Sequence, residues 1–150
     1  MNKKFLVIGN PVEHSLSPKL HNHWIKKNNL KASYDKKFLV QDEIQQLILD
    51  VREEKIQGLN VTVPFKKTII PFLDILSDEA KNSQSVNTIY KNKGKIIGDN
   101  TDIDGFKIGL ETTNQIIKNK EALILGAGGV VPSIIIALKK MQISKIYLSN

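Results

Sequence analysis

The feature that most constrains the fold is a strand, a glycine turn, a helix and a second strand near the end of the chain. An apolar run over residues 121–125 leads directly into Gly126-Ala127-Gly128-Gly129. Residues 131–141 are expected to form an apolar helix, and residues 145–148 a strand. Glycines in this context allow a tight turn and let the backbone approach a pyrophosphate at the helix N-terminus. The pattern predicts the first βαβ unit of a Rossmann dinucleotide-binding domain.

The residues after this unit bear on the choice of cofactor. An NAD-type site has an acidic residue about 20 positions after the glycines, which binds the ribose 2′-hydroxyl. Here that region reads Leu148-Ser149-Asn150 and holds no carboxylate, which favours NADP. Because a single βαβ unit leaves its strands without neighbours on one side, we expect these residues to be the front part of a longer protein.

The first part of the chain alternates strands and helices. Strands are expected over residues 3–9, 34–40 and 56–63, with helices over 17–28 and 42–52 between them. This βαβαβ order is typical of a mostly parallel sheet with helices on its faces. The sequence therefore predicts an α/β fold: an N-terminal αβ-sandwich followed by the start of a Rossmann domain.

The two helices have recognisable starts and apolar faces. Pro18 suits the first helical position, and Ser17 before it is either a helix cap alone or a ligand-binding hydroxyl as well. Ser15 lies on the loop after the first strand and could bind a hydroxylated ligand. The inner face of the first helix is expected to hold Leu20, Trp24 and Ile25. The second helix is expected to be capped by Asp42 and to bury Ile44, Leu47, Ile48 and Val51.

A polar cluster ends the third strand. The run Leu59-Asn60-Val61-Thr62-Val63 alternates as a strand does, and Pro64 stops it. Thr62 and Lys66 thus lie near the carboxyl end of a strand, which is where ligands bind in open α/β sheets. The alternative is an ordinary strand end with a solvated lysine.

An acidic segment follows a predicted hairpin. Residues 85–90 and 95–98 are expected to pair through a turn that ends at Gly94. Three carboxylates, Asp99, Asp102 and Asp104, come next, but a helix follows them and their spacing does not fit an EF-hand calcium loop. Asp102 is either the N-cap of that helix or a functional carboxylate. Gly105 and Gly109 on one side of the helix predict close backbone packing.

Composition excludes several classes of function. The chain has no cysteine, so it has no disulfide, thiolate nucleophile or cysteine-based metal site, and its three histidines lack metal-binding spacing. The net charge is +7, but Arg52 is the only arginine. This disfavours nucleic acid as the partner and suits an anionic small molecule. No apolar run is long enough for a membrane span and no signal peptide is recognised, so the cytoplasm is the expected location.

Taken together, the motifs resemble those of the shikimate dehydrogenase family in order and spacing, almost from end to end. The matching segments are Gly9-Asn10-Pro11, His14-Ser15-Leu16-Ser17-Pro18, His21-Asn22, Asn60-Val61-Thr62-Val63-Pro64-Phe65-Lys66, Ser85-Val86-Asn87-Thr88, Gly98-Asp99-Asn100-Thr101-Asp102-Ile103-Asp104-Gly105 and Gly126-Ala127-Gly128-Gly129. The resemblance implies NADPH-dependent reduction of 3-dehydroshikimate to shikimate in aromatic amino-acid biosynthesis. It also implies a shikimate-binding catalytic domain over 1–101. Residues 102–150 would be a linker helix and the first βαβ unit of an incomplete NADP-binding domain.

The resemblance also implies roles for single residues. Ser15 and Ser17 would bind the substrate carboxylate. The ring hydroxyls would be held by Thr62, Asn87 and Asp102, and Lys66 and Asp102 would be the catalytic pair. The NADP-binding residues would be Gly126, Ala127, Gly128, Gly129, Val130 and Asn150.

Other interpretations remain open. The nearest is a quinate/shikimate dehydrogenase that uses NAD, and a second is a non-catalytic shikimate-binding module. A basic nucleic-acid-binding protein is the third. We expect a monomer or a homodimer. Because the basic segment that reads the 2′-phosphate in the family should begin at about Asn150, this chain alone is expected to bind NADP weakly and to turn over poorly.

Overall fold

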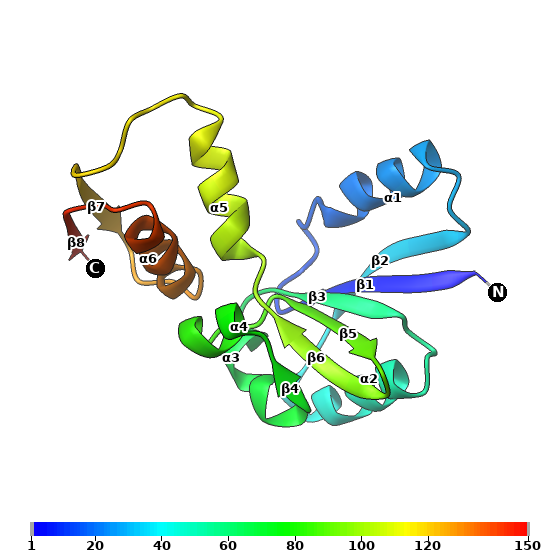
Figure 1. The fold of residues 1–150 in the computed structure, drawn as a ribbon. Coiled ribbons are helices and arrows are strands. Elements are labelled where there is room, and N and C mark those ends of the chain that lie inside the picture. The colour runs from blue at the N-terminus through cyan, green and yellow to red at the C-terminus, as the bar shows by residue number, and fades with distance from the viewer. Residues whose placement is uncertain (1, 150) are drawn as a thin grey trace.

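The computed structural model describes residues 2–149, which form a six-stranded sheet and a two-stranded sheet joined through a helix (Figure 1). We refer to the part that ends with β6 as the six-stranded unit and to β7, α6 and β8 as the βαβ unit. The elements are β1 (Lys3–Gly9), α1 (Ser17–Lys27), β2 (Ala32–Phe38), the 3-10 helix η1 (Gln41–Glu43), α2 (Ile44–Arg52), β3 (Gly58–Val61), α3 (Phe65–Thr68), the 3-10 helix η2 (Ile70–Phe72), β4 (Ile75–Leu76), α4 (Asp78–Ser83), β5 (Thr88–Asn92), β6 (Lys95–Asp99), α5 (Asp102–Glu111), β7 (Glu121–Leu125), α6 (Val131–Lys140) and β8 (Lys145–Ser149).

The larger sheet has the strand order β2-β1-β3-β5-β6-β4, in which only β5 runs antiparallel to its neighbours. This confirms the mostly parallel sheet. The strand β1 is apolar because it lies between β2 and β3, and Leu6, Val7 and Ile8 are all buried. The predicted β5–β6 hairpin is present, and Gly94 in its turn has φ +77°, a conformation that favours glycine.

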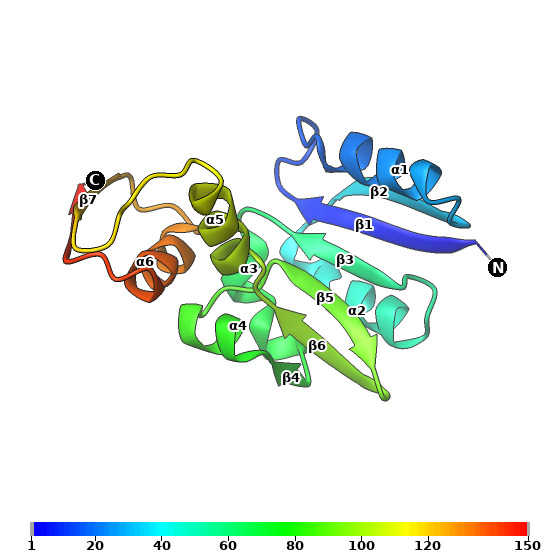
Figure 2. The ribbon, with the colours of Figure 1, turned by 45° about the horizontal axis from the view of Figure 1, so that its top comes forward.

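Helices cover the two faces of this sheet unequally. Figures 1 and 2 show α2, α3 and α4 on one face and α1 on the other. The main core forms under α2, whose four predicted inner residues are all buried against strands β1, β3, β5 and β6. Under α1 the cluster is small: Val7, Val12 and Tyr34, with Ile25 packed against them.

The core under α2 gives a stability prediction. Leu47 is 1% exposed, whereas Leu49 on the same helix is 41% exposed. We expect Leu47→Ala to lower the free energy of unfolding of the chain by about 2–5 kcal/mol, because it leaves a cavity in a close-packed core. The matched substitution Leu49→Ala should cost less than about 1 kcal/mol. Urea unfolding followed by circular dichroism measures both, and equal losses would show that α2 packs on a different face.

Several local predictions about the helices are wrong. Leu20 and Trp24 are about half exposed, because α1 covers only the β1–β2 edge and contacts the core through Ile25. Asp42 does not cap the second helix. Instead the Glu43 carboxylate accepts a hydrogen bond from the N–H of Val40 (3.0 Å), so a 3-10 turn precedes α2.

The βαβ unit is present as predicted, but its strands are not buried. Strands β7 and β8 pair in parallel, and α6 connects them. Leu123 and Leu125 are mostly exposed, because a sheet of two strands with one helix leaves much of its surface uncovered. The close packing expected at Gly105 and Gly109 is also absent from the described structure, since a Cβ added at either glycine would meet no atom within 4 Å.

Two further observations concern residues 2–149 as a whole. None of their helices has the length and apolar character that crossing a membrane requires. Within the same residues, no cluster of three or more histidine and acidic side chains is placed to hold a metal ion.

Candidate active site

The carboxyl ends of β1 and β3 bring two polar loops together. These strands are parallel neighbours, and beyond them Asn10 N donates to the Val63 carbonyl (2.9 Å) and Thr62 N to the Ile8 carbonyl (2.9 Å). The loop after β1 therefore lies against the end of β3. A cavity of about 260 Å³ forms there, lined by Val7, Pro11, Val12, His14, Ser15, Ser17 and Thr62. Three of the predicted substrate-binding residues thus share one cavity.

The two serines of this cavity have different structural roles from those expected. The helix α1 begins at Ser17 itself, and the hydroxyl of Ser17 makes no cap hydrogen bond. The Ser15 hydroxyl accepts a hydrogen bond from the N–H of Ser17 (3.3 Å), so Ser15 also shapes the start of the helix. The prediction of a Ser17 cap is wrong, because the last residue before α1 is Leu16.

Lys66 and Asp102 form an ion pair across the chain. Their Nζ and Oδ2 atoms are 2.7 Å apart, and the side chains are 15% and 23% exposed. Lys66 is held because Phe65 beside it is buried and because the Lys66 carbonyl accepts from Val86 N (2.8 Å). Asp102 is the first residue of α5 and does not cap it, so the N-cap interpretation is wrong. In this partly water-excluded setting the carboxylate fixes the direction of the ammonium.

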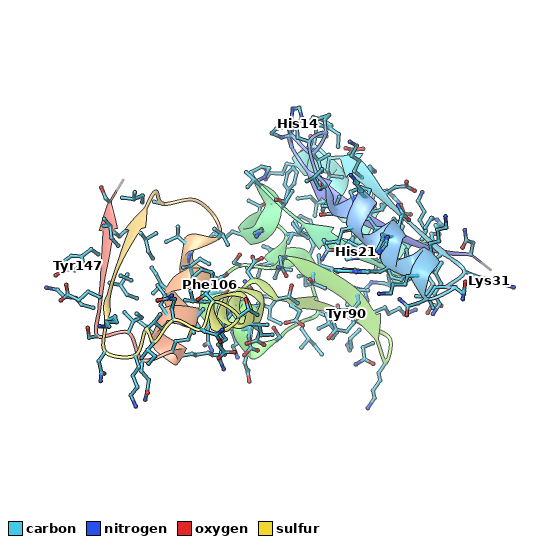
Figure 3. All side chains as sticks on the ribbon, turned by 90° about the horizontal axis from the view of Figure 1, so that it is seen from above. His14, His21, Lys31, Tyr90, Phe106 and Tyr147 are labelled. Atoms are coloured by element: carbon cyan, nitrogen blue, oxygen red, sulfur yellow. The ribbon has the colours of Figure 1, made fainter. Side chains whose placement is uncertain are left out.

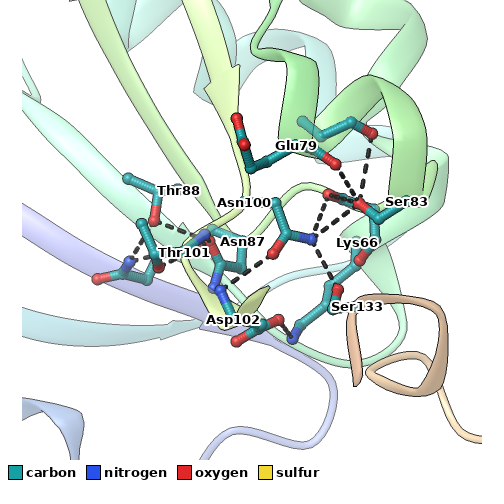
Figure 4. A network of polar contacts seen from close by, with 12 residues as sticks. Lys66, Glu79, Ser83, Asn87, Thr88, Asn100, Thr101, Asp102 and Ser133 are labelled. Atoms are coloured by element: carbon teal, nitrogen blue, oxygen red, sulfur yellow. Dashed lines mark hydrogen bonds and ion pairs between the residues drawn. The ribbon is translucent and has the colours of Figure 1, made fainter. Parts of the chain in front are cut away.

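Asn87 is fixed by hydrogen bonds on one side of its amide. Its Oδ1 accepts from Thr101 N (3.0 Å), Thr101 Oγ1 (3.1 Å) and Thr88 Oγ1 (2.9 Å) (Figure 4). An oxygen with three donors cannot exchange places with the nitrogen, so the orientation of the amide is set. These bonds leave the Nδ2 hydrogens as the donors that Asn87 can offer to a ligand. Through Thr101, Asn87 is also adjacent to Asp102.

Sequence reasoning missed a tyrosine that is hydrogen-bonded into the polar network around Asn87. The hydroxyl of Tyr34 in β2 donates to Asn60 Oδ1 (2.6 Å). Asn60 Nδ2 in turn donates to the Asn87 carbonyl (3.2 Å) and to Thr88 Oγ1 (3.1 Å). A polar chain therefore runs from Tyr34 through Asn60 to Asn87.

Burial explains the properties of Tyr34. It raises the pKa of the Tyr34 hydroxyl to about 12, because burial disfavours the charged phenolate. The ring stacks on His21 of α1, with centroids 4.1 Å apart, and Asn22 bonds both the N–H and the carbonyl of Tyr34. His21 lies on the side of α1 that faces Tyr90 of β5 (Figure 3), where a separate, mostly apolar cavity of about 340 Å³ lies between α1 and the sheet. His21 and Asn22 belong to a segment that matches the family motif, and the motif alone does not indicate these contacts with Tyr34.

The close approach of β1 to Thr62 gives a second prediction. A Cβ added at Gly9 would lie 2.5 Å from Thr62 Cγ2 and 3.1 Å from the Val63 carbonyl oxygen. Gly9→Ala must therefore displace the Thr62 side chain. For shikimate, the ligand that the sequence resemblance implies, we expect the dissociation constant to rise about 2- to 10-fold, equivalent to one lost hydrogen bond. Gly105→Ala, where an added Cβ meets nothing within 4 Å, is the matched control. Calorimetric titration measures both variants, and unchanged binding in Gly9→Ala would exclude Thr62 as a ligand.

The glycine turn has the geometry of an anion cradle. Gly126 has φ +97°, and its N–H bonds the Ser149 carbonyl (2.7 Å). No atom lies within 4 Å of a Cβ placed on Gly126, Gly128 or Gly129, so the backbone is open to a ligand. The ten-residue helix α6 begins directly afterwards at Val131 and points its N-terminus at the turn. Val130 of the predicted cofactor site is partly exposed beside the turn, and Asn150 lies outside the described residues.

Lys66 and the glycine turn line the same cavity. It measures about 310 Å³ and is bounded by residues from both units, among them Val63, Lys66, Ser85, Gly129 and Pro132. The structure thus brings the predicted residues together in two adjoining places. Ser15, Ser17 and Thr62 share the first cavity, and Lys66 with its partner Asp102 stands next to the second. Asn87 is hydrogen-bonded to Thr101, the residue before Asp102.

Comparison with known proteins identifies this arrangement. The model of the shikimate dehydrogenase substrate binding domain matches residues 7–89. The chain is 71% identical over all 150 residues to the shikimate dehydrogenase (NADP(+)) of Pelagibacter ubique strain HTCC1062, and it spans 57% of the length of that protein.

Solved structures agree in fold. The shikimate dehydrogenase from Aquifex aeolicus aligns with a TM-score of 0.91 at 38% identity, over 99% of this chain and 56% of that one. The shikimate 5-dehydrogenase from Thermus thermophilus in complex with NADP(H) and shikimate aligns with a TM-score of 0.89 at 30% identity, over 99% and 56% of the two chains. With more than half of its residues matched by the substrate-binding domain, the chain belongs to the shikimate dehydrogenase family.

Proposed function

We propose that the intact protein reduces 3-dehydroshikimate to shikimate with NADPH, as a step of aromatic amino-acid biosynthesis. By intact protein we mean this chain with the rest of its own sequence, or with the matching remainder of the Pelagibacter ubique relative joined after residue 150. The observation that carries the proposal is Lys66, which is paired with Asp102 and lines the same cavity as Gly129 of the glycine turn. We assign residues 1–101 to the substrate domain and 102–150 to the linker helix and the first part of the cofactor domain.

The cavity between β1 and β3 suits the acid group of the substrate. Hydroxyl donors from Ser15, Ser17 and Thr62 line it, and such groups bind a carboxylate without burying a second charge. Asn87 and Asp102 then hold the ring hydroxyls, one as a donor and the other as an acceptor. The net charge of +7 favours the approach of an anionic substrate. The Thermus thermophilus structure, which contains shikimate, supports this class of ligand.

The glycine turn fits the pyrophosphate of NADP. Open backbone at Gly128 and Gly129, at the N-terminus of α6, would hold the phosphates, and Gly126 makes the turn before them. When bound, NADPH supplies the hydride. Leu148 and Ser149 at the end of β8 offer no carboxylate to a ribose 2′-hydroxyl, which supports NADP over NAD.

Lys66 acts as the proton donor in this proposal. The ketone oxygen of the substrate gains negative charge as its carbonyl carbon is reduced, and it must take up one proton. The Lys66 ammonium stabilises that charge, gives up the proton and is reprotonated from water. Asp102 holds the ammonium in place at 2.7 Å, so little reorganisation is needed during the reaction.

The test is an assay of the purified intact protein with 3-dehydroshikimate, followed by the absorbance of the reduced nicotinamide. We expect NADPH oxidation with stoichiometric formation of shikimate, and a much lower kcat/KM with NADH. Equal use of NADH, together with oxidation of quinate in the reverse direction, would favour the quinate/shikimate alternative. Saturable shikimate binding without any turnover would overturn the proposal in favour of a binding module.

A further inference from the structure

One buried amide has no role in the substrate cavity or in the proton step. Asn100 lies between β6 and α5 and is 2% exposed. Its Oδ1 accepts a hydrogen bond from the backbone N–H of Asp102 (3.0 Å), and its own N–H donates to Asp99 Oδ1 (2.7 Å). The side chain of Asn100 therefore fixes the backbone at the residue that supplies the carboxylate of the ion pair.

The other end of this amide contacts three segments. Nδ2 of Asn100 lies within hydrogen-bond distance of the Ser85 carbonyl (2.8 Å), Ser133 Oγ (2.9 Å) and Ser83 Oγ (3.0 Å) (Figure 4). Ser83 ends α4, Ser85 precedes β5, and Ser133 lies in the first turn of α6. Ser133 is completely buried. A single side chain thus connects the helix that follows the glycine turn to the N–H of Asp102.

The Nδ2 group of Asn100 can lose its contact with Ser133 of α6 and still donate both of its hydrogens. An amide nitrogen carries two hydrogens, and here three acceptors surround it. Two of them, on Ser83 and Ser85, belong to the six-stranded unit, and the third, on Ser133, belongs to the βαβ unit. If α6 moves away, both hydrogens keep an acceptor, so no buried donor is left unpaired. The Ser133 contact can therefore form and break while the rest of the network persists.

We infer that Asn100 is a positioning residue that couples the docking of α6 to the orientation of Asp102, and through it of Lys66. The inference rests on the proposed function, because it concerns the same proton step. The acceptor and the donor of Asn100 are opposite branches of one planar amide, so a pull on Nδ2 from Ser133 reorients the oxygen that holds the N–H of Asp102. Ser133 follows the glycine turn closely. A ligand bound in the turn therefore changes the geometry of the Lys66–Asp102 ion pair through one rigid group, the Asn100 amide.

A second contact of α6 with the six-stranded unit provides a matched control. Lys140 Nζ of α6 lies 3.1 Å from Glu79 Oε1 of α4, and both side chains are partly exposed. This ion pair also joins the βαβ unit to the six-stranded unit, but it makes no contact with Asn100. Loosening the interface in general and breaking the link to Asp102 can therefore be separated by substitution.

The test compares the kinetics of Ser133→Ala and Lys140→Gln in the intact protein. We expect Ser133→Ala to lower kcat roughly 2- to 30-fold, the range found for residues that carry coupling between sites, with KM for 3-dehydroshikimate within about twofold of wild type. Lys140→Gln should leave both constants unchanged. A wild-type kcat in Ser133→Ala, or equal losses in the two variants, would overturn the inference.

A double variant distinguishes coupling through Asp102 from a purely structural role of Ser133. If Ser133 acts through Asp102, adding Ser133→Ala to Asp102→Asn should lower kcat no further, whereas independent effects would multiply and contradict the inference. Should Ser133→Ala fail to fold, Ser133→Cys keeps the size and offers only a weak acceptor, and the same outcomes apply. An inactive wild-type protein would instead refute the proposed function, so the two failures are distinguishable.

Discussion

Replacing Lys66 by alanine should lower kcat of the intact protein about a thousandfold, because the substitution removes both the proton donor and the charge that stabilises the forming alkoxide. The substrate carboxylate would still bind to Ser15, Ser17 and Thr62, because these residues line a different cavity from Lys66. The dissociation constant of shikimate should therefore change by no more than about tenfold, the worth of one hydrogen bond. We therefore expect Lys66→Ala to slow the chemical step and to leave substrate binding largely intact.

Steady-state assays and calorimetric titration of the same preparation separate these two effects. Lys81→Ala is the control, because Lys81 is an exposed lysine of α4 in the same unit and lies outside both cavities. It removes the same charge from the protein and should leave kcat unchanged. A kcat of Lys66→Ala within about tenfold of wild type would be too small a loss for a general acid, and it would remove Lys66 from the mechanism.

The second large effect is expected for Asp102→Asn, which keeps the shape of the side chain and removes its charge. Lys66 is only 15% exposed, so without the carboxylate its ammonium loses its partner and its fixed direction. Misplacement of a reacting group by about 1 Å can cost about a hundredfold in rate, and we expect kcat to fall by at least this factor. Because Asp102 also holds a ring hydroxyl in the proposal, KM should rise as well.

Asp104→Asn is the matched control for this variant. Asp104 lies in the same first turn of α5 but is exposed, and its substitution changes the net charge and the helix N-terminus in the same way. The kcat and KM of Asp104→Asn should equal those of wild type. If Asp104→Asn lost as much activity as Asp102→Asn, the effect would come from the stability of α5 and not from the ion pair.

The sheet could be predicted from the sequence because its signals are local. The strand β1 was expected over residues 3–9 and is found there, since an apolar run stops at Gly9 before Asn10-Pro11. The strand β3 is shorter than the expected 56–63: it covers Gly58–Val61, because a turn in which Phe65 N donates to the Thr62 carbonyl (3.0 Å) begins before Pro64. The glycine of the β5–β6 turn adopts the expected positive φ.

Burial was harder to predict, because it depends on what covers a surface. Leu20 and Trp24 have helical spacing with Ile25, yet only Ile25 contacts the core, since α1 meets the edge of the sheet. The strands of the βαβ unit are apolar, but Leu123 and Leu125 have no neighbouring layer in the described structure. Periodicity indicates which residues share a face and does not indicate whether that face is covered.

The candidate site was predicted through family resemblance more than through spacing. Lys66 and Asp102 are far apart in sequence, and no local pattern predicts their contact; the motif resemblance paired them, and the structure places them 2.7 Å apart. The Tyr34–Asn60 bond and the Asn100 network were missed. Asparagine and serine are usually found on surfaces and in turns, so composition gives no sign that Asn100 and Ser133 are buried and bonded to each other.

The most direct test of a substrate site between β1 and β3 is a titration of the 150-residue chain with shikimate, followed by its backbone amide resonances. We predict saturable shifts at Ser15, Thr62 and Asn87, which Thr62→Val weakens by removing one hydroxyl at constant shape. Shifts confined to Gly58 and Tyr90, beside the cavity under α1, would place the ligand elsewhere. A folded chain that shows no shifts at all would contradict a preformed substrate site in these residues.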